Sequence, residues 1–103
     1  MKYQMFAIFD KAVDAYAPPF YVRSKGEALR GFADQVNRPG ENNGLFNHPE
    51  HFFIFHIGEY DDEECSVSML EPRECLGCAL EFKEEPDAAG PVMEMMNGPP
   101  IAS

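Results

Sequence analysis

Apolar side chains between residues 25 and 36 recur with the period of an α-helix. They form one continuous stripe and comprise Ala28, Leu29, Phe32, Ala33 and Val36. Ser24 stands at the N-cap position, and Glu27 is expected to return a hydrogen bond to the backbone amide of Ser24. Asn37 is expected to adopt the left-handed conformation at the helix end, and Pro39 cannot continue the helix. The pattern therefore predicts an amphipathic helix over residues 25–36 that covers a sheet.

Alternating apolar and polar positions predict the strands of that sheet. They cover residues 2–10, 20–23, 52–57, 65–70 and 76–83. Residues 10–17 are expected to be a long loop, residues 38–44 a turn-rich segment and residues 47–50 one turn of helix. Glu71-Pro72 is expected to break the chain between the last two strands. The predicted fold class is α+β, a mainly antiparallel four- or five-stranded sheet with one amphipathic helix packed on one face.

The chain of 103 residues is long enough for one domain. We place that domain at residues 1–83, because residues 84–103 combine acids, prolines and a methionine cluster without usable periodicity. This segment is predicted to be a flexible tail; the alternative is a tail folded over the apolar surface of the domain. No apolar run reaches the ~20 residues of a membrane span, and the N-terminus lacks a signal-peptide pattern, so an intracellular protein is expected.

The formal net charge of −10 argues against nonspecific affinity for nucleic acid, but the charge is unevenly distributed. Residues 1–38 carry six basic and four acidic side chains, whereas residues 39–103 carry two basic and fourteen acidic ones. Any basic surface must therefore come from the helix half. We expect cations along the helix and its incoming strand, with carboxylates on the far side. The alternative is an acidic, solvated surface without a binding role.

The basic half contains the candidates for a nucleic-acid interface. Cations along the helix edge can hold a phosphate backbone, while Tyr3, Tyr16 and Tyr21 on an open sheet face stack unpaired bases. The predicted nucleic-acid-binding residues are Lys2, Tyr21, Arg23, Lys25, Arg30 and Arg38. In the alternative, the tyrosines fill the core and the arginines pair with Glu27, Asp34 and the acidic strands.

Residues suited to metal or catalytic chemistry are sparse. Cys75 and Cys78 have the spacing of half a zinc knuckle, but a single pair is a weak signal, and a strand places these two residues on opposite faces. The remaining ligands would have to come from Cys65, His48, His51 and His56. We therefore expect reduced thiols, no metal and no cofactor. No nucleophile and base stand at a recognisable spacing, so no enzymatic activity is expected.

Three segments carry a family resemblance. They are MKYQMFAIFDKAVDAYAPPF at residues 1–20, PPFYVRSKGEALRGFADQVN at residues 18–37 and NHPEHFFIFHIGEYDDE at residues 47–63. With these segments the chain resembles the small non-structural DNA-binding protein of the single-stranded-DNA microviruses, in the gokushovirus and chlamydia-phage branch. The likeness covers residues 1–62 and fades after Glu63. It implies binding of the viral genome and a role in the switch to single-stranded DNA synthesis and packaging, with Arg23, Lys25 and Arg30 as the motif-matching cations.

The resemblance implies single-stranded DNA of the viral genome as the partner and the host bacterial cytoplasm as the location. The alternative is an acidic adaptor that binds a viral replication or capsid protein, or a host factor, through its hairpin and tail without touching DNA. A homodimer is expected, because an edge strand and a single helix leave apolar surface uncovered.

Overall fold

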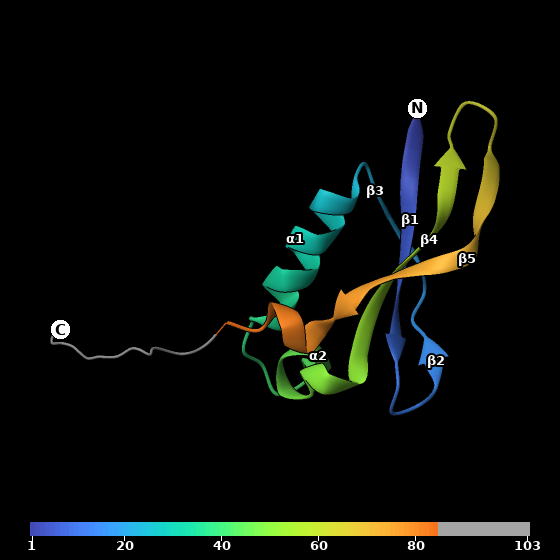
Figure 1. Cartoon of the computed structure of the whole chain (residues 1–103). Helices are drawn as coiled ribbons and strands as arrows, with labels where there is room; N and C mark the ends of the chain where they lie inside the picture. Colours follow the sequence, from blue (N-terminus) through green and yellow to red (C-terminus); the bar gives the residue numbers. More distant parts are fainter. Residues whose placement is uncertain (85–103) are drawn as a thin grey trace, which may run out of the picture.

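The computed structural model of the protein describes residues 1–84, which form a five-stranded antiparallel sheet with helices beside it (Figure 1). The strands are β1 (Lys2–Asp10), β2 (Ala15–Tyr16), β3 (Phe20–Val22), β4 (Phe52–Asp61) and β5 (Ser66–Cys78). The helices are α1 (Lys25–Val36) and α2 (Gly44–Asn47). Two 3-10 turns complete the fold: η1 (Pro49–His51) leads into β4, and η2 (Ala79–Phe82) follows β5. The predicted α+β class, with one amphipathic helix on an antiparallel sheet, is confirmed.

The predicted tail, residues 84–103, lies outside the described residues except for Glu84. None of the helices in residues 1–84 is both long and apolar enough to cross a lipid bilayer.

β1 lies at the centre of the sheet and pairs along both edges. β4 follows one edge over the whole length of β1, with a bulge after Met5. The other edge pairs with β3 near the start of β1 and with β2 near its end. The prediction of a loop over residues 10–17 is therefore wrong at β2. Asp14 adopts the left-handed conformation (φ 56°) in a tight turn, and the chain then satisfies its backbone groups on the free edge of β1.

α1 begins and ends at the predicted residues, but both of its caps differ in detail. The Ser24 hydroxyl accepts a hydrogen bond from the Glu27 amide at 3.2 Å, as expected. The Glu27 carboxylate, however, accepts from the amide of Arg23 at 3.1 Å and not from that of Ser24. Asn37 has φ −102° and is not left-handed. Its side-chain amide donates instead to the carbonyls of Ala33 and Phe82, both at 2.9 Å, which ties the helix end to η2.

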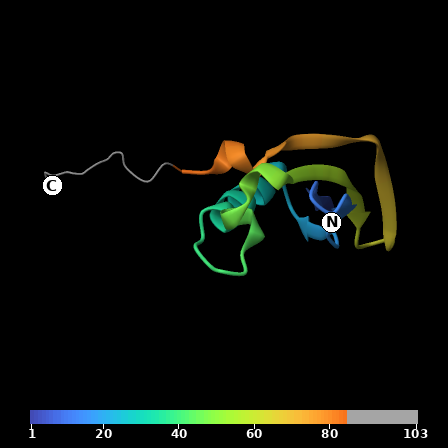
Figure 2. The ribbon, with the colours of Figure 1, turned by 90° about the horizontal axis from the view of Figure 1, so that it is seen from below.

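The hydrophobic core lies between α1 and one face of the sheet. It comprises Phe6, Ala28, Phe32, Val36, Ile54 and Ala79, with Ile8, Phe20, Val22 and Leu29 packed against it. Burying a large apolar side chain contributes about 1.5–3 kcal/mol. Successive side chains of a strand point to opposite faces, so Tyr3 of β1 and Tyr21 of β3 lie on the face opposite α1. In Figure 2 the helices lie on one side of the sheet only, and β5 turns sharply along its length.

The β4–β5 hairpin departs most from the predicted pattern. The chain continues as one strand through Pro72, where the sequence predicts a break. The proline is tolerated because β5 is an edge strand, and a register shift between His56 and Gly58 lets residues 70–73 pass without regular pairing. The strand predicted to continue to residue 83 ends at Cys78 and gives way to η2. Ala79 is buried there, and Phe82 packs edge-on against Phe32 at 5.3 Å.

Asparagine side chains hold the segment between α1 and β4. Asn43 caps α2 and also donates to the carbonyls of Gln35 and Arg38, both at 2.8 Å. Asn47 donates to two carbonyls of the same loop. Residues 38–43 are irregular, as the turn-forming residues predict, and the helical turn expected at residues 47–50 is observed as η1.

Candidate functional site

The face of the sheet opposite α1 carries a group of three tyrosines. Tyr3 and Tyr60 are direct partners across β1 and β4, and Tyr21 reaches this face from β3, with its ring 5.8 Å from that of Tyr60. Together with Asp62 they line a hollow of about 580 Å³, which we call the tyrosine groove. A hydrogen bond to Cys65 raises the pKa of Tyr60, so this phenol is neutral at physiological pH. Tyr21 is 47% exposed, which leaves ring surface open to a ligand.

A second hollow on the same face is centred on Tyr16 and Arg73. It has a volume of about 370 Å³ and is lined by Ala7, Tyr16, Ala17, Pro19, Ile57, Met69 and Arg73; we call it the arginine hollow. The Arg73 Nε donates to the Tyr16 hydroxyl at 2.9 Å, and its guanidinium carbon lies 5.3 Å from the centre of the Tyr16 ring. Tyr16 in turn packs against Phe9 and Phe55 at 4.8 and 5.5 Å. The hollow thus holds a fixed cation beside an aromatic cluster.

Sequence reasoning missed Tyr60 and Arg73. Strict alternation within β4 would have placed Tyr60 on the face of Ile54 and His56. The register shift between His56 and Gly58, which leaves residue 57 unpaired with β1, brings Tyr60 to the face of Phe55 instead. Arg73 follows the predicted break at Glu71-Pro72, and no local pattern indicates its contact with Tyr16.

Two of the six predicted binding residues form ion pairs with carboxylates. The Lys25 ammonium lies 2.9 Å from Glu74 of β5, and the Lys2 ammonium lies 3.7 Å from Glu59 of β4. The hydrogen bond from Lys25 lowers the pKa of Glu74. The expected separation of cations from carboxylates is therefore wrong at these two positions, because acidic residues of the hairpin reach back to β1 and α1.

The other three predicted cations, Arg23, Arg30 and Arg38, are exposed and form no ion pair with any side chain of residues 1–84. Arg30 and Arg38 belong to α1 and its C-terminal end, whereas the tyrosine groove lies on the opposite face of the sheet. Arg23 directly follows β3. The structure thus brings Tyr21 together with Tyr3 and Tyr60 but does not bring the helix cations to them.

All three tyrosines singled out from the sequence lie outside the core cluster. The alternative in which Tyr3, Tyr16 and Tyr21 fill the core is therefore wrong. Two of them line the tyrosine groove and the third lines the arginine hollow.

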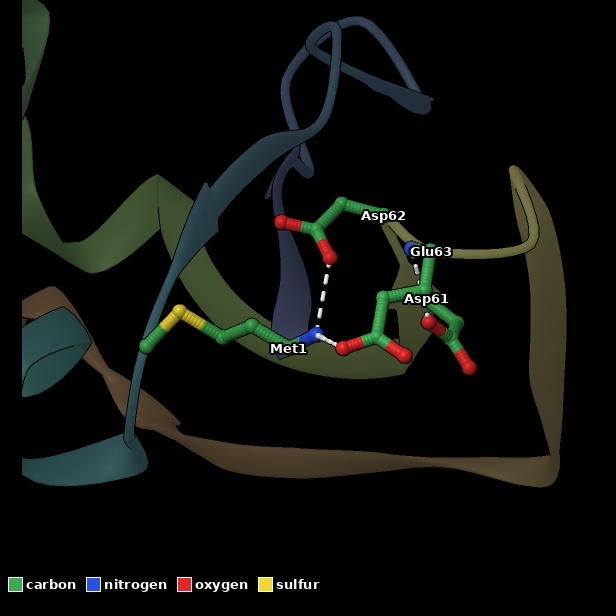
Figure 3. Close-up of polar contacts among 4 residues, drawn as sticks. All are labelled: Met1, Asp61, Asp62 and Glu63. Atoms are coloured by element: carbon green, nitrogen blue, oxygen red, sulfur yellow. Dashed lines mark hydrogen bonds and ion pairs between the residues drawn. The ribbon is translucent and has the colours of Figure 1, made fainter.

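The turn between β4 and β5 places carboxylates beside the tyrosine groove. Figure 3 shows the Met1 ammonium group between two of them, 2.8 Å from Asp62 Oδ1 and 3.2 Å from Glu63 Oε2. The hydrogen bond to Asp62 raises the pKa of the Met1 amino group. The backbone amide of Glu63 donates to Asp61 at 2.9 Å, which orders the turn. This negative charge beside the tyrosine groove repels phosphate. An anion is therefore expected to bind more favourably in the arginine hollow than in the tyrosine groove.

The cysteines do not gather with the histidines into the zinc site considered from the sequence. Cys65 and Cys75 are exposed and Cys78 is half-buried. His56 is buried and its Nε2 shares a 2.8 Å hydrogen bond with Gln4, which is a structural role. Within residues 1–84 the potential ligands that lie within reach of one another are His48, Glu50 and His51.

Comparison with known proteins identifies the family. No curated protein and no solved structure matches the chain significantly. A protein-family model described as "Phage ORF5 protein" matches residues 3–82. The match extends well beyond Glu63, so both hollows and the whole β4–β5 hairpin lie within the matched range. The chain therefore belongs to the phage ORF5 protein family.

Proposed function

We propose that this phage protein is non-structural and binds single-stranded DNA during viral genome replication, in the switch to single-strand synthesis and packaging that the resemblance to the microvirus protein implies. The observation that supports DNA contact best is the aromatic face, where the tyrosine groove and the arginine hollow lie side by side on one face of the sheet. Unpaired bases stack on exposed aromatic rings with little regard to sequence, and each stacked base contributes about 1–3 kcal/mol.

The charge of the chain determines the expected mode of binding. A net charge of −10 and the acidic turn beside the groove both oppose a phosphate backbone. Arg73 stands in the arginine hollow, and Arg23 follows Tyr21 by two residues. With about two phosphate contacts, the slope of log K against log salt for a single strand is about −1.4. Affinity is therefore expected to come from stacking and to depend only weakly on salt.

A fluorescence anisotropy titration with a labelled oligodeoxythymidine of about 16 nucleotides tests the proposal. We expect binding at low salt, and weaker binding to a duplex of the same length, whose bases are already stacked. Replacing Tyr21 by alanine is expected to weaken binding about 5- to 150-fold, equivalent to the ~1–3 kcal/mol of one stacked base, whereas Tyr21→Phe retains affinity.

Leu80→Ala is the matched control, because Leu80 is 55% exposed but lies on η2, away from the aromatic face. Its affinity should equal that of the unmodified protein. If the unmodified protein shows no affinity for the oligonucleotide at low salt, the proposal is wrong.

A second candidate function rests on the hairpin. β5 exposes three apolar side chains close to the acidic turn, with exposed fractions of 52% for Val67, 56% for Met69 and 38% for Leu70. Apolar surface bordered by charge is typical of a protein-docking site. We propose as the alternative that the hairpin binds a viral replication or capsid protein, or a host factor, without DNA contact. In a pulldown from infected cells, loss of the partner on Glu63→Lys/Glu64→Lys, with DNA affinity absent throughout, would favour this function.

A further inference from the structure

The turn that leads into β4 gathers two histidines and a carboxylate outside both hollows. His48 and His51 stand three residues apart at the ends of a 3-10 turn, where side chains at this spacing lie one above the other. Their rings are nearly parallel, with an interplanar angle of 17° and 5.7 Å between centroids. The Glu50 Oε2 lies 3.8 Å from the Nε2 of His51. One ligand atom from each of these three side chains lies within 4.8 Å of the other two.

The backbone of this turn is fixed from several directions. The amide of His48 donates to Gly44 at 2.7 Å and the amide of His51 donates to His48 at 3.0 Å. The carbonyl of His51 accepts from the amide of Lys11 at 2.8 Å, and the carbonyl of Pro49 accepts from the Cys78 thiol at 3.5 Å. Contacts to α2, to the β1–β2 turn and to β5 therefore hold the positions from which the two imidazoles project.

The two imidazoles are available for coordination. Neither forms a side-chain hydrogen bond within residues 1–84, and the Glu50 carboxylate is the charged group that faces them. His56 differs, because its ring is buried, stacked on Phe6 at 4.9 Å and hydrogen-bonded to Gln4. In a tetrahedral site with metal–nitrogen bonds of about 2.0–2.1 Å, ligand atoms stand about 3.4 Å apart. The exposed side chains can close that gap by small rotations, without movement of the anchored backbone.

We propose that His48, Glu50 and His51 bind one divalent transition-metal ion. Two imidazoles with one carboxylate suit Zn²⁺, Ni²⁺ or Cu²⁺, whereas Mg²⁺ and Ca²⁺ prefer oxygen ligands alone. Three protein ligands leave at least one position for water, and the exposure of the cluster makes the ion exchangeable. All three ligands lie within residues 48–51, so a bound ion stiffens η1 and its N-cap, the turn that leads directly into β4. The cluster is independent of the aromatic face, and the metal site does not depend on DNA binding.

Titration of the full chain with ZnCl₂, followed by isothermal calorimetry, tests the site. The protein must be purified without a polyhistidine tag, because the tag would bind the metal itself. We expect one ion per chain, no response to MgCl₂, and a loss of affinity on the order of tenfold or more in His48→Ala and in His51→Ala. Glu41→Gln, an exposed carboxylate in the preceding loop, is the matched control and should leave affinity unchanged.

Substitution of Co²⁺ for Zn²⁺ identifies the ligands directly. A site built from imidazole and carboxylate gives d–d bands without a thiolate charge-transfer band, and Cys78→Ser should not change the spectrum. Circular dichroism of each variant shows that the fold is retained. Absence of zinc binding, unchanged affinity in both histidine variants, or a thiolate band that disappears with Cys78→Ser would each overturn the assignment.

Discussion

Replacing Gly58 by alanine tests the close approach of β4 and β5. A Cβ atom at this position would stand 2.6 Å from the carbonyl oxygen of Ser68 and 3.3 Å from the Cα of Met69. Both are backbone atoms, so no side-chain rotation relieves the contact and the two strands must separate. Overpacking of this kind costs about 1–3 kcal/mol. Alanine also reduces the conformational entropy of the unfolded chain, which offsets about 0.4–1 kcal/mol of that cost. We expect Gly58→Ala to lower the free energy of unfolding by roughly 1–2 kcal/mol.

Gly31 provides the matched control, because the same substitution meets the opposite environment. It lies within α1, and a Cβ atom there meets nothing within 4 Å. Alanine is favoured over glycine in a helix by about 0.8–1.0 kcal/mol. A change of about 1 kcal/mol shifts the melting temperature of a domain of this size by ~4–8 °C. In thermal melts, Gly31→Ala should therefore raise the melting temperature by about 4–8 °C, and Gly58→Ala should lower it by about 5–15 °C. Shifts of the same sign and size in the two variants would refute the packing argument.

Three further predictions follow from the ion pairs, the helix cap and the edge strand. Lys25 holds the pKa of Glu74 below its ordinary value of 4.5, so the pair stabilises the fold above that pH and its contribution is lost as the pH falls through the lowered value. In thermal melts, Glu74→Gln should therefore be less stable than the unmodified protein at neutral pH and equal to it in strong acid. Asn37→Ala removes the bonds to Ala33 and Phe82 and should cost about 2 kcal/mol in urea unfolding; an unchanged midpoint would show that the tie to η2 is unimportant. We expect a homodimer formed through β5, so light scattering should report a dimer that Val67→Lys converts to a monomer, and a monomeric unmodified protein would contradict this.

The elements that depend on neighbouring residues are predictable from the sequence, and those that depend on distant partners are not. α1 follows from Ser24 and its apolar stripe, all within one short stretch. Asn37, by contrast, leaves the expected left-handed conformation because its side chain meets Phe82, and that residue is far away in the chain. β2 exists because the edge of β1 is free beside it, and β5 passes through Pro72 because it is itself an edge. Pairings between segments that are distant in the chain cannot be predicted from the local hydropathy pattern.

The candidate site was predictable in its aromatic half. Tyr3, Tyr16 and Tyr21 were singled out from the sequence as stacking residues, and the structure puts Tyr3 and Tyr21 in one groove. The register that brings them to one face, with Tyr21 opposite Met5, and the contribution of Tyr60 were visible only in the structure. The cationic half was not predictable, because the pairing of Lys25 with Glu74 joins α1 to a strand whose path the sequence did not indicate. Arg73 was missed for the same reason.

Several cations of the fold are engaged by other protein groups. For the proposed binding of single-stranded DNA, stacking is therefore expected to contribute more affinity than contacts to phosphate. Lys2 and Lys25 are engaged with carboxylates, and Lys83 lies 3.4 Å from the centre of the Phe46 ring while donating to the carbonyl of the same residue. Even Arg73 is oriented by Tyr16. Among the cations without such a partner, Arg30 and Arg38 belong to α1 and its C-terminal end, away from the aromatic rings, which remain accessible on the face opposite α1. If the protein binds single-stranded DNA, removing one ring must therefore weaken binding more than removing one exposed helix cation, and comparison of Tyr21→Ala with Arg30→Ala decides the point. The reverse order would place the interface along α1 and reject the aromatic face.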